Sequence, residues 1–164
     1  GADFPVAAIN AAIAKTGLST QVDDTAVDEI LSLAYGGQQT FLGLSLLYDD
    51  AAWGTTPFHQ DHLFAKSLFK PKELELRSRS DWFHMKDRLG NLCLLLASEN
   101  IGKTDMPLDA WLESREPGFL KRHLIPQDKQ LWDFERFPDF LKAREELIRG
   151  RLKALFASPM PLEG

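Results

Sequence analysis

A short, uninterrupted apolar run, residues 92–97, constrains the fold more than any other feature of the sequence. Its length suits a buried β-strand and is far below the roughly 20 residues that a membrane-spanning helix needs. A second short segment, Phe58–Phe64, follows Pro57 and is mixed in polarity, so we expect a strand there that leads into a loop. The 164 residues leave room for one compact domain around these two segments.

The residues before these strands show helical periodicity. An Ala- and Ile-rich stretch predicts a helix over residues 4–16. Asp24 or Thr25 is expected to cap a second helix, which Gly36 and the glycine after it end. A third helix, over about residues 38–48, is apolar almost all round and is therefore expected to be buried.

Further helices are expected between and after the strands. A short one is predicted around Asp81–Arg88, and Ser98 is expected to cap another. Pro107 is expected to begin a third helix, with Pro117 closing that stretch, and a long amphipathic helix should begin at Pro138. The apolar side of that long helix is expected to contain Phe140, Leu141, Leu147, Ile148, Leu152 and Leu155.

Composition excludes a disordered or membrane-embedded chain. With 44% hydrophobic and 26% charged residues, the sequence is that of a soluble globular protein. The first ten residues lack the basic segment of a signal peptide. The single cysteine, Cys93, lies in the apolar run and is expected to be a buried, inert thiol, which favours the reducing cytoplasm. We also expect the chain to be part of a longer protein.

Charge is divided unevenly along the chain. Residues 1–61 hold eight acids and one base, a balance of −7, whereas residues 62–164 hold sixteen acids and eighteen bases, a balance of +2. The stretch Lys66–Arg88 contains seven bases and four acids. Such a patch either attracts phosphate or is an ordinary solvated loop, and its charge alone does not decide between the two.

Residues suited to phosphodiester hydrolysis gather in and after the two strand segments. This reaction needs a base that activates water and a cation that stabilises the charge developing at phosphorus. His62 can serve as the base near neutral pH, and Asp61 and Asn100 offer the oxygen ligands that Mg²⁺ prefers. Because consecutive strand residues point to opposite faces, Asp61 can face an ion held against the following helix while His62 faces the water.

The order and spacing of these residues resemble a known motif. Asp61–Phe64, then Gly90–Leu92, then Asn100 and Lys103 are similar to the HNH motif of the ββα-metal (His-Me finger) nucleases. The nine-residue step from Asn91 to Asn100 resembles the HNH domains of RNA-guided CRISPR nucleases.

A closer resemblance is to the C-terminal nuclease domain of GmrSD-type modification-dependent restriction proteins and SspE-like phage-defence proteins. In that family an apolar helix ends in Leu-Leu-Tyr, as Leu46–Tyr48 does here, before the Asp-His, Gly-Asn-Leu and Asn-x-x-Lys elements. The resemblance spans about residues 25–156 and includes His123–Pro126 and the helix that contains Arg144. Ala65 departs from it, because the family often has proline at that position.

The resemblance implies a fold class and an activity. The fold would be a mainly α-helical single domain with a small two-stranded antiparallel ββα-metal (HNH) core at residues 58–106, between helical flanks at residues 1–50 and 107–158. The activity would be that of a DNA endonuclease of a bacterial restriction or antiviral defence system, which nicks one strand and leaves 5′-phosphate and 3′-hydroxyl ends. It would use one divalent ion, Mg²⁺, with Mn²⁺ as a substitute. RNA cleavage and an inactive HNH fold that binds DNA or docks a partner remain alternatives.

The resemblance also implies roles for single residues and for partners. His62 would be the general base, Asp61 and Asn100 the metal ligands, and Asn91 the residue that orients the loop or backbone of the base. Lys103, Lys66 and Arg88 would bind DNA. The protein would be cytoplasmic and would not interact with a membrane. An upstream nucleotide-hydrolysing or modification-sensing domain of the same polypeptide is also expected.

The remaining histidines and aromatic residues carry weaker expectations. His59 either supports Asp61 through a hydrogen bond or caps a turn. His84 and His123 are expected to be structural. Two aromatic residues of the stretch between the strands are expected to belong to the core rather than to stack on bases: Trp82 and Phe83.

Overall fold

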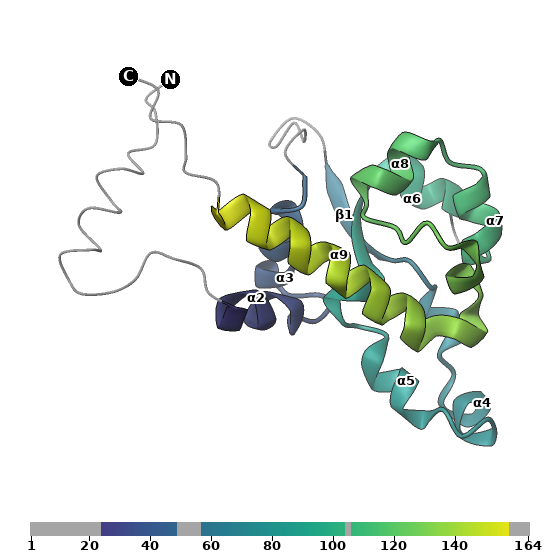
Figure 1. The fold of residues 1–164 in the computed structure, drawn as a ribbon. Coiled ribbons are helices and arrows are strands. Elements are labelled where there is room, and N and C mark those ends of the chain that lie inside the picture. Colours follow the sequence, from purple (N-terminus) through teal and green to yellow (C-terminus); the bar gives the residue numbers. More distant parts are fainter. Residues whose placement is uncertain (1–23, 49–56, 104–105, 158–164) are drawn as a thin grey trace, which may run out of the picture.

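The computed structural model describes residues 24–48, 57–103 and 106–157, and the expected helix over residues 4–16 lies outside them (Figure 1). The described chain is mainly helical and contains one two-stranded antiparallel sheet. Its strands are β1 (Phe58–His62) and β2 (Leu92–Leu96). The expected mainly α-helical fold with two antiparallel strands is therefore confirmed.

The sheet lies between two groups of apolar side chains. β1 pairs with β2 in a register that sets Phe58 opposite Leu96 and His62 opposite Leu92. Leu92 and Leu94 pack with residues of the N-terminal helices, whereas Cys93 and Leu95 pack with an aromatic cluster. Because both faces of β2 are covered, its sequence is continuously apolar rather than alternating.

The helix that follows the sheet completes a strand–strand–helix unit. Helix α6 (Ala97–Lys103) starts directly after β2. Its first turn is capped by Glu99, whose carboxylate accepts a hydrogen bond from the main-chain N–H of Leu96 at 2.9 Å. The helix therefore begins at Ala97, which corrects the prediction of a helix that starts after Ser98.

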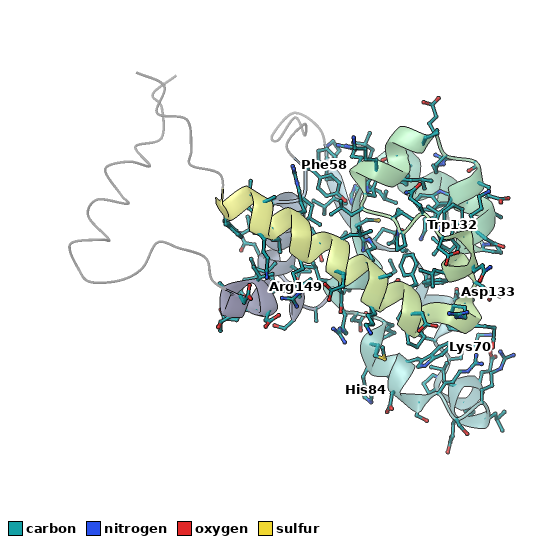
Figure 2. All side chains as sticks on the ribbon, in the orientation of Figure 1. Phe58, Lys70, His84, Trp132, Asp133 and Arg149 are labelled. Carbon is teal, nitrogen blue, oxygen red and sulfur yellow. The ribbon has the colours of Figure 1, made fainter. Side chains whose placement is uncertain are left out.

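The connection between the strands is largely helical. It consists of η1 (Lys66–Leu68), α4 (Pro71–Leu76), α5 (Ser80–Met85) and η2 (Leu89–Asn91). Helix α5 confirms the short helix expected there, whereas α4 was not predicted although its proline occupies the first helical turn. Figure 1 shows α4 and α5 projecting from one end of the molecule, and Figure 2 shows His84 and Lys70 there.

Two helices precede the sheet. Helix α2 (Asp24–Leu31) confirms the expected second helix, and it lies against the last helix, where Arg149 pairs with Asp28 at 2.6 Å. Helix α3 (Gln38–Ser45) packs on β2 through one face only. Two leucines of the predicted third helix are therefore exposed, which corrects the expectation that this segment is buried all round: Leu42 (56%) and Leu46 (37%).

The C-terminal flank contains more short helices than expected. They are α7 (Leu108–Glu113), α8 (Pro117–Arg122), η3 (Lys129–Trp132) and η4 (Phe134–Arg136). Pro117 begins α8 instead of only closing the preceding stretch, because a proline at the first helical position loses no required hydrogen bond.

The long C-terminal helix α9 (Phe137–Ala157) crosses the whole molecule in Figure 1. Four of its expected apolar residues are fully buried, but Leu147 and Leu155 are 43% and 38% exposed, which corrects that part of the prediction. The core side of the helix instead includes Arg144, which is fully buried. None of the helices among the described residues is long and apolar enough to cross a membrane.

Candidate active site

Asp61 and His62 occupy the last two positions of β1. Asp61 lies opposite Cys93 and His62 opposite Leu92, so their side chains leave opposite faces of the sheet, as their adjacency predicts. The carboxylate of Asp61 meets the side chain of Lys103 from α6. The imidazole of His62 lies on the other face, toward the connection between the strands.

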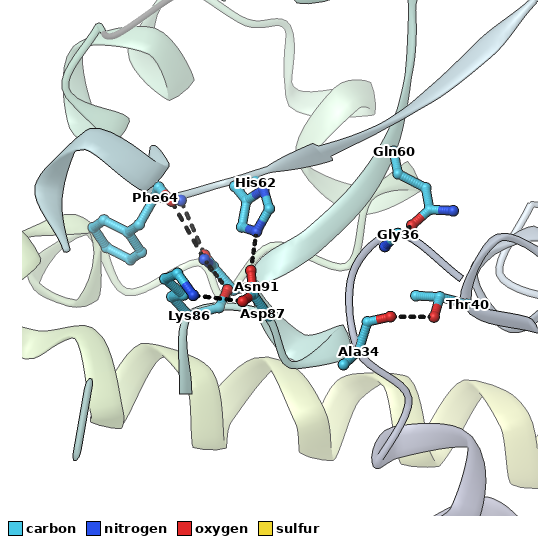
Figure 3. Close-up of polar contacts among 9 residues, drawn as sticks. All are labelled: Ala34, Gly36, Thr40, Gln60, His62, Phe64, Lys86, Asp87 and Asn91. Carbon is cyan, nitrogen blue, oxygen red and sulfur yellow. Dashed lines mark hydrogen bonds and ion pairs between the residues drawn. The ribbon is translucent and has the colours of Figure 1, made fainter. Parts of the chain in front are cut away.

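Asn91 fixes the chain that leaves β1. Its side-chain oxygen accepts from the N–H of Phe64 at 3.0 Å, and its side-chain nitrogen donates to the carbonyls of Phe64 at 3.3 Å and Lys86 at 2.8 Å (Figure 3). The main-chain carbonyl of Asn91 also accepts from the N–H of Leu63 at 2.8 Å. The buried amide of Asn91 thus joins Phe64, at the start of the connection between the strands, to Lys86 near its end.

Helix α9 holds Gly90 and Asn91 in place. Arg144 donates from Nη1 to the carbonyl of Gly90 at 2.7 Å, and from Nη2 to the carbonyl of His123 at 3.1 Å. A Cβ atom at Gly90 would lie 2.7 Å from side-chain atoms of Leu141 and Glu145. Any larger residue at position 90 would force these side chains of α9 to shift, which gives a packing reason for the glycine of the Gly-Asn-Leu element.

His62 is enclosed by residues that sequence reasoning did not identify. Its Nε2 lies 2.9 Å from Oδ1 of Asp87, whose Oδ2 lies 2.5 Å from the ammonium of Lys86 (Figure 3). The ring of Tyr35 lies 4.4 Å from the imidazole, between centroids, and the ammonium of Lys66 lies 3.7 Å from the Tyr35 centroid. The His62 side chain is only 4% exposed.

Burial and charge act in opposite directions on His62 and Asp87. Burial lowers the pKa of His62, and this effect outweighs the hydrogen bond to Asp87, which raises the pKa. The neutral imidazole therefore prevails at neutral pH, and this form accepts a proton. Burial acts to raise the pKa of Asp87, but the hydrogen bonds with Lys86 and His62 together outweigh burial and lower this pKa. Asp87 is therefore an ionised carboxylate.

Lys103 is buried on Asp61. Its side chain is 2% exposed, its ammonium lies 2.8 Å from Oδ2 of Asp61, and it also donates to the main-chain carbonyl of His62. The resemblance led us to expect this lysine near a DNA phosphate. The structure gives it instead a role at the end of β1, and a contact with DNA stays a prediction.

Asp61 is the expected metal ligand whose side chain the structure describes, and one of its carboxylate oxygens pairs with Lys103. Its carboxylate is 23% exposed, and Mg²⁺ typically uses one or two carboxylates while keeping several waters. Asn100, the second expected ligand, belongs to α6, but its side chain lies outside the described part of the structure. Among the described residues, no group of three or more His, Cys, Asp or Glu side chains is arranged to hold a metal ion.

The basic residues between the strands are partly neutralised. Lys66 is exposed beside Tyr35 on the side of His62, whereas Arg88 pairs with Glu145 of α9 at 2.7 Å. In the same stretch Arg77 and Arg79 both pair with one carboxylate of η4, that of Glu135. DNA binding by Lys66 and Arg88 stays a prediction, and of the two only Lys66 adjoins the residues that enclose His62.

The other histidines have distinct surroundings. His59 is exposed on β1, and no hydrogen bond joins it to Asp61. His84 is exposed on α5. His123 is buried, with Nδ1 2.9 Å from the hydroxyl of Tyr48, and burial lowers its pKa to about 3. The expected structural role of His123 agrees with these contacts.

The cysteine and the aromatic residues of the connection lie in the core. Cys93 is fully buried, as expected, and burial raises the pKa of its thiol to about 12. Trp82 and Phe83 pack against the aromatic cluster as partly buried side chains, also as expected. None of these three side chains is placed for chemistry at His62 or Asp61.

No protein-family model matches this sequence, and no curated protein is significantly similar to it. The HNH resemblance therefore rests on the motif residues of the sequence.

Proposed function

We propose that this chain is a metal-dependent HNH-type endonuclease domain that hydrolyses phosphodiester bonds in DNA. The observation that supports this best is the position of Asn91, whose amide holds the backbone of Phe64 while Asp61 and His62 leave opposite faces of β1. A strand end of this kind separates a proton acceptor from a carboxylate by the thickness of the sheet. In the proposed reaction a phosphate bound at this end of β1 meets both groups once the ring of Tyr35 has moved from His62.

The proposed reaction hydrolyses one phosphodiester linkage by transferring its phosphoryl group from the 3′ oxygen to water. His62 accepts a proton from the water molecule, whose oxygen forms a bond to phosphorus while the bond from phosphorus to the 3′ oxygen breaks. The 3′ oxygen then takes a proton from solvent, which gives 5′-phosphate and 3′-hydroxyl ends. When bound at Asp61, a divalent ion supplies positive charge that stabilises the phosphate as the bond breaks.

Lys103 supports this arrangement from within the protein. It neutralises Asp61 on one carboxylate oxygen and binds the carbonyl of His62, so the two functional residues share one buried anchor. Lys66 is exposed next to Tyr35 and is the nearest described base with access to a DNA backbone on the His62 side. The positions of Lys103 and Lys66 favour binding of a DNA strand across the end of β1.

A second candidate function is an inactive HNH fold that binds DNA or docks a partner domain. The observation that favours it is the enclosure of His62, which is 4% exposed beneath Tyr35. A substrate water can reach this imidazole only if the ring of Tyr35 moves. The two candidate functions thus differ in one measurable property, which is whether the chain cleaves nucleic acid.

Nicking of supercoiled plasmid DNA in Mg²⁺, with a single-stranded and a double-stranded RNA alongside, tests the proposal. We expect the wild type to nick DNA and His62→Ala to lose at least roughly 10²-fold in rate, the scale of general-base catalysis. His59→Ala is the matched control, because His59 is an exposed histidine of the same strand without a hydrogen bond to Asp61.

Each outcome of this assay assigns one function. Cleavage of DNA that His62→Ala removes and His59→Ala retains supports the nuclease. Cleavage of RNA but not of DNA would identify RNA as the substrate and leave the proposed hydrolysis mechanism unchanged. DNA binding without cleavage, at any Mg²⁺ or Mn²⁺ concentration, assigns the inactive module and overturns the proposal. We also propose that the chain belongs to a restriction or antiviral defence protein and lies next to a nucleotide-hydrolysing or modification-sensing domain. A test of this part needs the full-length polypeptide.

A further inference from the structure

The carboxylate of Asp87 lies at the edge of the His62 ring that carries Nε2. Oδ1 of Asp87 and Nε2 of His62 are 2.9 Å apart, within the range of an N–H···O hydrogen bond. An ionised carboxylate only accepts hydrogen bonds, so the imidazole must donate through Nε2. A neutral imidazole that is protonated on Nε2 carries its lone pair on Nδ1.

One contact to its side chain and one to its main chain hold Asp87 in place. Lys86 donates from its ammonium to Oδ2 of Asp87 at 2.5 Å, and Tyr35 donates its main-chain N–H to the carbonyl of Asp87 at 2.9 Å. Asn91 binds the carbonyl of Lys86 through its side chain at 2.8 Å, as Figure 3 shows. Turning the carboxylate away from His62 would break the ion pair with Lys86, while the hydrogen bond from Tyr35 fixes the main chain of Asp87.

The ring of His62 is also restrained on its face. The ring of Tyr35 packs against it at a tilt of 47°, with 4.4 Å between the ring centroids. An imidazole packed in this way, with a carboxylate at one nitrogen, has one preferred orientation, in which the other nitrogen points away from that carboxylate. This restraint comes from the turn between α2 and α3, which lies far from His62 in the sequence.

We propose that Asp87 is a positioning residue that keeps His62 protonated on Nε2 and so assigns Nδ1 as the proton acceptor of the reaction. This inference rests on the proposed function. The proton of the attacking water then passes to Nδ1, and the imidazolium that forms continues to donate from Nε2 to Asp87. Asp87 does not touch the substrate and does not take up the proton.

The substitution Asp87→Asn separates positioning from packing. The ammonium of Lys86 needs an acceptor, so the amide oxygen of the asparagine should turn toward Lys86 and its NH₂ group toward His62. An NH₂ group donates, and Nε2 would then have to accept, which moves the imidazole proton to Nδ1. The side chain keeps its size, yet the tautomer of His62 should reverse.

Long-range ¹H–¹⁵N spectra of the ¹⁵N-labelled chain read the tautomer directly, without substrate or metal. The sequence has four histidines, and loss of one signal set in His62→Gln assigns His62. In the wild type we expect a protonated Nε2 and a bare Nδ1, and in Asp87→Asn the reverse. Asp81→Asn is the matched control, because Asp81 is an exposed acid of the same connection and should leave the tautomer unchanged.

Kinetics on plasmid DNA provide the second measurement. We expect Asp87→Asn to lower kcat by about 10²-fold or more while KM changes little, because a wrong tautomer removes the base and not the binding surface. Asp87→Glu, which retains a carboxylate, should restore the wild-type tautomer and part of kcat.

The spectra decide the inference even if the variants fold poorly or the chain does not cleave DNA. A wild-type His62 that carries its proton on Nδ1 would overturn it, whatever the variants do. So would an Asp87→Asn variant that keeps both the wild-type tautomer and the wild-type kcat. Absence of cleavage together with the expected tautomers would overturn the nuclease proposal alone and leave the hydrogen-bond assignment standing.

Discussion

The ammonium of Lys103 lies 2.8 Å from Oδ2 of Asp61, and this lysine is 2% exposed whereas Asp61 is 23% exposed. The proposed metal ligand is therefore also the group that neutralises a buried cation. Substitutions at Asp61 change the stability of the domain as well as its affinity for a metal. An activity assay on such variants has to separate these two effects.

Asp61→Ala should destabilise the domain, because it leaves the ammonium of Lys103 buried without a carboxylate. Loss of one partner of a buried ion pair costs roughly 3–5 kcal/mol, and we expect about 2–3 kcal/mol because Asp61 is partly exposed. Asp61→Asn keeps an oxygen acceptor and should cost only about 1 kcal/mol. Urea unfolding of both variants measures the difference, and equal midpoints for Asp61→Ala and the wild type would contradict it.

Asn91→Ala should destabilise the domain by roughly 2–4 kcal/mol, since it leaves three buried main-chain groups without partners. Asn91→Asp should be at least as harmful, because a carboxylate cannot donate to the carbonyls of Phe64 and Lys86. Thermal unfolding measures both changes. Gln130→Ala is the control, because it removes an exposed amide side chain, and a loss in Asn91→Ala no larger than in this control would refute the role assigned to Asn91.

Tyr35→Ala should uncover His62. The imidazole is 4% exposed under the Tyr35 ring, so an acylating reagent such as diethyl pyrocarbonate should modify it slowly in the wild type. We expect a clear increase in the modification rate of His62 in Tyr35→Ala and little change in Tyr35→Phe, which retains the ring. Mass spectrometry of the peptide that contains His62 gives the rate. Identical rates in all three proteins would show that Tyr35 does not cover the site.

The stability of the domain should fall in acid because of His123. Burial lowers its pKa to about 3, whereas the unfolded chain titrates near 6.5. The unfolded state binds the proton more tightly, so this contribution is complete above about pH 6.5 and is lost as the pH falls toward 3. The loss should reach about 2–3 kcal/mol near pH 4.5.

Substitution of His123 by a neutral side chain tests this pH dependence. His123→Gln should unfold at a lower urea concentration at neutral pH but show a smaller further loss between about pH 7 and pH 4.5. His84→Gln should keep the wild-type dependence, because His84 is exposed. Parallel curves for the wild type and His123→Gln would mean that His123 is protonated equally in both states.

Removal of divalent ions should abolish cleavage without unfolding the chain. Two apolar clusters supply the core, and the described residues contain no group of three or more ligands that would hold the fold together through a metal. Circular dichroism and nicking, both with excess chelator, measure the two properties in parallel. Either melting of the helices or full cleavage under these conditions would show that the proposed site at Asp61 is wrong.

The sequence by itself determined the parts of this protein that depend on neighbouring residues. The apolar run predicts β2, and the adjacency of Asp61 and His62 predicts their opposite faces, because side chains alternate along any strand. The long helix that became α9 follows from apolar spacing over many turns. Asn91 was predicted to orient the loop or backbone of the base from the motif, and its side chain binds the backbone of Phe64 there.

Only the tertiary structure decided which distant groups meet these residues. Asp87 and Tyr35 reach His62 from segments more than twenty residues away, and neither has a local pattern that sets it apart from other acids or aromatic residues. The motif predicts Lys103 only as a residue near DNA and gives no role to Arg144, yet both are buried because carbonyl or carboxylate groups of other elements satisfy their donors. Such contacts depend on how the helices pack on the sheet, and periodicity carries no information about that packing.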